Sequence, residues 1–397
     1  MTAVRHLLLV RNLIVVVAGL GVAGFAVTRM IARPASGPGA ACRRLGAAER
    51  TACYSRLLSE RLGAQGVADA VATLDALAAA DADVAEHAHE YAHGIGIEAY
   101  SRSPDIAATF AACGDGYSSG CRHGVIQAYF EARDQVTTSE VEALCQPFKS
   151  ATASRWVLFQ CVHGMGHGLT MFHAHDLPRA LADCDLLTEG WDRESCYGGA
   201  FMENVINVTS PHHPASQLAA QSHHHQTAAA FKAIDPDDPL YPCSIMAERY
   251  LNACYQMQTS VMLYHNHGDI AAAGRSCDRA PAHMRSVCYQ SLGRDITSYA
   301  LRDPQKSADL CAKGSEAYRP ACYFGAAKAL VDWTATTGAA FTFCRIVAQE
   351  PGGPTCYQAL GEEIATLVAT TPEREEQCTR AQDPAAVAAC RQGAGLR

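Results

Sequence analysis

The repeating unit of this chain is clearest in residues 304–335, which read PQKSADLCAKGSEAYRPACYFGAAKALVDWTA. Residues 304–311 have the pattern of a short helix, and a break follows around Gly314. Apolar and small residues then recur at helical spacing. The stretch therefore predicts a helical hairpin with one cysteine in each helix, at Cys311 and Cys322.

Similar pairs of cysteines recur along the whole chain. The sequence contains 18 cysteines, and in chain order they form nine close pairs with none left over. The second cysteines of the last five pairs are separated by a constant step of 34 residues, which is typical of repeat proteins. The predicted pairs are 42/53, 113/121, 145/161, 184/196, 243/254, 277/288, 311/322, 344/356 and 378/390.

A disulfide within each hairpin explains this spacing. Closing a loop of about a dozen residues stabilises the folded state by about 3 kcal/mol in the chain-entropy model. Zinc clusters and iron–sulfur sites favour C-x2-C spacings, which the chain lacks. The sequence thus predicts an all-α fold of disulfide-stapled helical-hairpin repeats, an α-solenoid with a period of about 34 residues in its C-terminal half. The unit resembles tetratricopeptide repeats in length only.

The N-terminal residues predict export. Arg5 and Arg11 precede the uncharged apolar run Leu13–Val27, a pattern of a signal peptide or of an uncleaved membrane anchor. We therefore assign residues 1–33 to one of these two roles. Disulfides also need an oxidising compartment, so we expect a periplasmic or extracellular protein, either free or bound to the membrane through this segment.

Composition and spacing divide the remainder of the chain. Residues 34–235 are predicted to form irregular repeats that carry most of the histidines, and residues 236–397 form regular repeats that offer a surface to a protein partner. The apolar content of 49% and charged content of 18% exclude global disorder. A net charge of −8 without a basic stripe argues against binding to nucleic acid.

Histidines appear where the repeats are irregular. The segment CRHG at 121–124 aligns with CVHG at 161–164, and YAHG at 91–94 fits the same frame with Tyr in place of Cys. The YAHG segment marks a repeat without cysteines. Equivalent positions of stacked repeats lie side by side, and the glycine after each histidine allows close helix approach. The aligned histidines are His93, His123 and His163.

Two further histidines extend this set. His89 precedes His93 by four residues and His167 follows His163 by four, so each pair lies on one helix face. We expect a transition-metal site in this region, because imidazole-rich ligand sets suit Zn, Cu or Fe. Hydrogen-bonded core histidines are the alternative. The candidate ligands are His89, His93, His123, His163 and His167.

Residues 89–93 read HEYAH, which resembles the H-E-x-x-H motif of zincin metalloproteases. The resemblance implies that His89 and His93 bind zinc and that Glu90 acts as general base. The longer zincin pattern places a third histidine at the position that Ala99 occupies here. His123, His163 or Glu203 would then have to supply the third ligand.

Glu203 is the other candidate catalytic residue. It lies in the unit that follows His163, where an acidic ligand or proton-transfer group would complete a metal site. A solvated glutamate on a helix surface is the alternative. We expect His173 and His175 at the surface, and we expect the Ser-, Pro- and His-rich insertion at 208–242 to form a surface loop.

Three functions remain open at this point. The first is a metal-dependent enzyme, either a hydrolase or an oxidoreductase, in which Glu90 or Glu203 moves protons. The second is a non-enzymatic extracytoplasmic protein that binds metal. The third is a protein-interaction scaffold in which the histidines are structural.

Overall fold

The computed structural model describes residue 37 and residues 39–150, 154–209 and 231–396. This part of the chain consists of helices and their connections and contains no β-strand, which confirms the predicted all-α fold. No helix within it is long and apolar enough to cross a membrane. The predicted signal or anchor at 1–33 lies outside the described residues, as does most of the insertion at 208–242.

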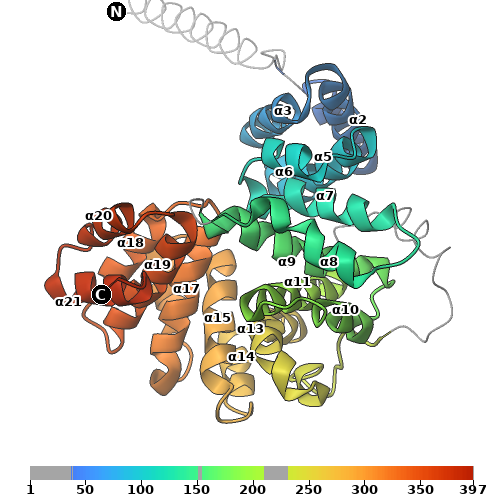
Figure 1. The fold of residues 1–397 in the computed structure, drawn as a ribbon. Helices are drawn as coiled ribbons and strands as arrows, with labels where there is room; N and C mark the ends of the chain where they lie inside the picture. Colours follow the sequence, from blue (N-terminus) through green and yellow to red (C-terminus); the bar gives the residue numbers. More distant parts are fainter. Residues whose placement is uncertain (1–36, 38, 151–153, 210–230, 397) are drawn as a thin grey trace, which may run out of the picture.

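The described part of the chain starts with a small helical cap and continues as hairpins (Figure 1). Each hairpin has a first helix and a second helix, and the second helices pack against one another in chain order. The cap consists of η1 (Cys42–Arg44), α2 (Ala47–Gln65), α3 (Val67–Ala80) and α4 (Ala82–Glu86). It leads into α5 (Ala88–Arg102), the second helix of the predicted unit without cysteines.

The first helices are short, with at most ten residues each. They are α6 (Ile106–Ala112), α8 (Thr138–Leu144), α10 (Leu177–Cys184), α14 (Ile270–Cys277), α16 (Pro304–Cys311), α18 (Gly338–Val347) and α20 (Thr371–Thr379). Single turns of 3-10 helix occur at η2 (Tyr117–Ser119), η3 (Gln146–Phe148), η4 (Cys243–Ile245) and η5 (Glu316–Tyr318).

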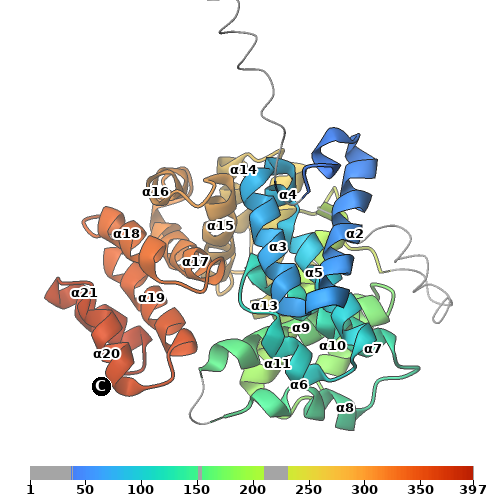
Figure 2. The same cartoon turned by 90° about the horizontal axis from the view of Figure 1, so that it is seen from above.

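The second helices are α7 (Gly120–Glu131), α9 (Arg155–Phe172), α11 (Gly190–Thr209), α13 (Glu248–His265), α15 (Arg285–Tyr299), α17 (Arg319–Asp332), α19 (Gly353–Leu367) and α21 (Pro384–Gly393). α19 also contacts α9, so the row from α9 to α19 closes into a ring. Seen from above, α18–α21 lie on one side of the molecule and α2, α3 and α5 on the other (Figure 2).

The cysteines pair as the sequence predicts. In the described chain, nine disulfides join the predicted partners, with Cα–Cα separations of 5.4–5.9 Å, and no cysteine is free. These separations are typical of disulfides. So many disulfides indicate an oxidising, extracytoplasmic environment.

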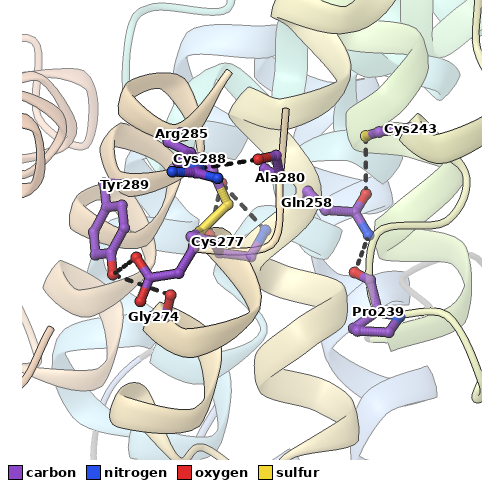
Figure 3. The surroundings of a disulfide bond; sticks show 12 residues. Pro239, Cys243, Gln258, Gly274, Cys277, Ala280, Arg285, Cys288 and Tyr289 are labelled. Carbon is purple, nitrogen blue, oxygen red and sulfur yellow. Dashed lines mark hydrogen bonds between the residues drawn. A yellow bond between two sulfur atoms is a disulfide. The ribbon is translucent and has the colours of Figure 1, made fainter. Parts of the chain in front are cut away.

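In two hairpins, the tyrosine that follows the second cysteine forms a hydrogen bond across the hairpin. Next to the Cys277–Cys288 disulfide, the Tyr289 hydroxyl donates to the Gly274 carbonyl at 3.0 Å and to the Asp278 carboxylate at 2.9 Å (Figure 3). Because Asp278 follows the first cysteine, this bond spans the hairpin beside the disulfide. A tyrosine and an aspartate at the same places, Tyr197 and Asp185, make the same bond.

Glycines allow two second helices to approach closely. A Cβ atom on Gly124 of α7 would lie 2.0 Å from the carbonyl oxygen of His93, and one on Gly96 of α5 would lie 1.9 Å from that of Cys121. The prediction that the glycine after each histidine permits close approach is therefore correct for Gly124. It is wrong for Gly94, which is exposed and has nothing within 4 Å of an added Cβ, because Gly96 faces α7 instead.

Gly124 and Gly94 make a matched test of the contact between α5 and α7. We expect Gly124→Ala to lower the free energy of unfolding by about 1–3 kcal/mol, because backbone has to shift to admit the methyl group. We expect Gly94→Ala to leave it unchanged or raise it by up to about 1 kcal/mol, because alanine is the better helix former. Urea denaturation with the disulfides intact measures both, and equal effects would contradict the predicted close approach.

Candidate functional site

The five candidate histidines lie in one continuous row across α5, α7 and α9. Ring-centroid distances are 6.1 Å from His93 to His89, 5.9 Å from His89 to His123, 4.9 Å from His123 to His167 and 5.1 Å from His167 to His163. His89 is half-buried and the other four are buried. The repeat frame thus brings together side chains that are far apart in the sequence.

Close packing of α5, α7 and α9 determines where the histidines of the row lie. The approach of α5 to α7 at Gly124 places the helix turn that bears His93 beside the one that bears His123. On the other side of α7, Gly164 of α9 lies against His123, with 3.3 Å between an added Cβ and the His123 Cδ2 atom. The imidazoles therefore lie side by side because the glycines, which have no side chain, let the helices that bear them come close together.

His163 and His167 bring two ring nitrogens close together. Their Nε2 atoms are 3.3 Å apart. The Nδ1 atom of His167 lies 2.9 Å from the Glu203 carboxylate, which accepts its hydrogen. His163 donates to a backbone carbonyl, that of Ser195 on α11. Both rings are thus fixed in orientation by acceptors on α11.

Burial favours the neutral form of two imidazoles of the row, those of His163 and His123. Burial, and next the charge of His167, lowers the pKa of His163 to about 3. Burial and the neighbouring histidines hold the pKa of His123 well below its ordinary value. The His123 Nε2 atom is buried and has no hydrogen-bond partner among the described residues. Neutral imidazole is the form that binds metal ions.

Glu203 is fully buried beside His167, so the alternative of a solvated helix surface is wrong. In addition to His167 it contacts the Nε2 atom of His175 at 3.4 Å. The expectation that His173 and His175 lie at the surface is also wrong. His173 is buried against Asp183, and His175 is half-buried because the chain turns back after α9 through a positive φ of 64°.

Glu90 has a different partner. Its carboxylate is about one-third exposed and forms an ion pair with His87, with 3.1 Å between Oε2 and Nδ1. His89 uses its own Nδ1 atom to donate to the Tyr117 carbonyl at 2.8 Å. The zincin resemblance implies a glutamate that activates water beside the two histidines. In the structure, Glu90 instead contacts His87, which is not part of the row.

Metal ligation is not preformed in this arrangement. Within the described ranges, no three His, Cys, Asp or Glu side chains are already arranged to hold a metal ion. No family model, curated protein or solved structure matches the chain. Among the described residues, the site offers a convergent pair of nitrogens, on His163 and His167, and a nearby nitrogen without a hydrogen-bond partner, His123 Nε2.

The role of Glu203 in the row is testable by two substitutions. We expect Glu203→Ala to lower the free energy of unfolding by about 3 kcal/mol, because buried imidazole donors lose their acceptor. Glu203→Gln keeps one carbonyl acceptor, so we expect a smaller loss. Thermal and urea unfolding of metal-free protein measure both variants. An Ala variant as stable as the wild type would show that the buried carboxylate does not hold the row together.

Proposed function

We propose that this is an extracytoplasmic protein that binds a transition-metal ion through His163, His167 and His123. The observation that supports the proposal is the 3.3 Å separation of the His163 and His167 Nε2 atoms. Two nitrogens bound to tetrahedral zinc at about 2.0–2.1 Å are about 3.3–3.4 Å apart. The pair is therefore already spaced as two ligands of one ion.

The hydrogen bonds of the two rings support the same reading. His167 donates from Nδ1 to Glu203, and His163 donates to the Ser195 carbonyl. When both neutral imidazoles carry their hydrogen on Nδ1, lone pairs remain on the two Nε2 atoms and face each other. A bound cation between them turns that repulsion into attraction. Carboxylate or carbonyl acceptors on the far nitrogen are also what orients metal-binding histidines in proteins.

His123 is the third ligand of the proposed site. Its ring stacks on that of His167 at 4.9 Å, and its buried Nε2 atom has no hydrogen-bond partner among the described residues. Rotation of this ring toward the His163–His167 pair would complete three imidazole ligands. His89 and His93 continue the row beyond His123. Because His89 is half-buried, this end of the row offers an ion a path inward from the surface.

The ligand chemistry limits the metal. Imidazole nitrogens favour Zn, Cu or Fe over Ca or Mg. The cysteines are all in disulfides and supply no thiolate. Export or membrane attachment through residues 1–33, and a protein partner on the regular units of 236–397, remain predictions that accompany this proposal.

Zinc binding to oxidised, metal-free protein tests the proposal. We expect one equivalent of zinc to bind the wild type and to be lost in His163→Ala and in His167→Ala. We expect Glu203→Gln to weaken binding by about 10–100-fold, because an acceptor that orients a ligand is impaired. Isothermal titration and elemental analysis after gel filtration measure both effects.

His283→Ala is the matched control, because His283 is exposed and pairs with Glu248 away from the row. It should bind zinc like the wild type. Loss of zinc in His93→Ala alone, with His163→Ala unaffected, would assign the metal to the H-E-x-x-H segment instead. If the correctly disulfide-bonded wild type binds no zinc, the protein-interaction scaffold is the function that remains.

A metal-dependent enzyme is the second candidate, and one observation favours it. His163 lies on the wall of a pocket of about 460 Å³, so a ligand of the proposed metal borders a space large enough for a small molecule. Catalytic metal sites keep one coordination position open, whereas structural sites are closed.

Cobalt substitution separates the two candidates. If the site is catalytic, we expect azide to change the visible spectrum of Co(II)-loaded protein, because azide binds at the open position. A spectrum that azide leaves unchanged indicates a closed shell and favours metal storage or a structural role.

A further inference from the structure

The pocket beside His163 lies at the centre of the helix ring. Its volume is about 460 Å³, and α9, α11, α13, α15, α17 and α19 all contribute side chains to its wall. This volume falls within the range of about 300–1,000 Å³ that is typical of small-molecule sites. The contact of α19 with α9 closes the ring around it.

Carboxylates dominate one wall of this pocket. Asp332 at the end of α17 and Glu362 and Glu363 on α19 all line it. Lys328 on α17 is ion-paired with both glutamates, at 3.2 Å to Glu362 and 2.9 Å to Glu363. One ammonium therefore faces three carboxyl groups on this wall.

The other cation of the pocket is already neutralised. The Arg294 guanidinium contacts the carboxylate of its neighbour Asp295 at 2.6 Å and donates to the Ser260 hydroxyl at 2.6 Å. Burial, and next the negative charge of Glu363, raises the pKa of Asp332 well above its ordinary value. The raised pKa favours the neutral form of Asp332, so the excess negative charge of this wall is that of Glu362 and Glu363 against the single ammonium of Lys328.

Aromatic rings face the same space from α9 and α11. Phe159 and Trp191 line the pocket with their ring centroids 6.3 Å apart, and Trp191 is 37% exposed. The guanidinium of Arg155 lies over the Trp191 ring at 5.6 Å, so this ring already attracts a cation. Aromatic faces stabilise organic cations through the quadrupole of the ring and bury the apolar part of a ligand.

From these walls we infer that the central pocket binds a small organic cation, an alkylammonium group with an apolar substituent. The ammonium lies against Glu362 and Glu363, and the substituent packs on Phe159 and Trp191. A bare metal ion would not use the aromatic residues, and an anion would meet the carboxylates. This site borders the histidine row at His163 and needs no bound metal.

Three compounds of similar shape test the inference on metal-free protein. We expect 2-phenylethylamine to bind about tenfold or more tightly than 2-phenylethanol, because a charge-assisted hydrogen bond replaces a neutral one. We expect 3-phenylpropanoate not to bind. Isothermal titration at neutral pH measures all three. Equal binding of the amine and the alcohol, tighter binding of the acid, or no binding of the amine at millimolar concentration would each overturn the inference.

Substitutions with opposite expected signs distinguish recognition from a structural role. We expect Glu362→Gln and Glu363→Gln to weaken binding of the amine by about tenfold each, and Lys328→Met to strengthen it, because Lys328 competes for the same two carboxylates. Asp309→Asn, an exposed aspartate on α16, is the charge-matched control and should bind like the wild type. Weaker binding in Lys328→Met would contradict an electrostatic site. Circular dichroism and thermal unfolding confirm that each variant is folded.

Discussion

The disulfide inside each hairpin is the constraint on which the rest of this structure depends. Helices as short as α14 and α16, of eight residues each, are not stable alone in water. The covalent link to α15 or α17 holds each of them in place, and in the α14–α15 hairpin the Tyr289–Asp278 hydrogen bond fixes its orientation. The second helices are then free to pack on one another.

The fold and the histidine row were largely predictable from the sequence, for one physical reason. The cysteine spacing sets the repeat frame, and in a stacked repeat the same position recurs on the same surface. That frame correctly places His93, His123 and His163 on neighbouring helices. The disulfide pairs follow from the same spacing, because only close partners can close such short loops.

Other features depend on geometry that no local pattern encodes. His175 reaches Glu203 only because the chain reverses after α9, and Gly94 and Gly96 differ only in which one faces α7. The contact between α9 and α19 depends on the small rotation at every helix crossing, summed around the ring. The central pocket and its wall at Asp332 and Glu363 exist because these rotations together bring α19 back to α9.

Closure of the ring also limits how this protein can change. An open solenoid can gain or lose a unit at any point, because each unit contacts only its neighbours. Here α9 and α19 meet across the sequence, so an extra hairpin between them would push the two apart and open the pocket. Between these helices the copy number of the unit is therefore fixed by geometry, and variation by duplication is confined to the hairpins outside the ring.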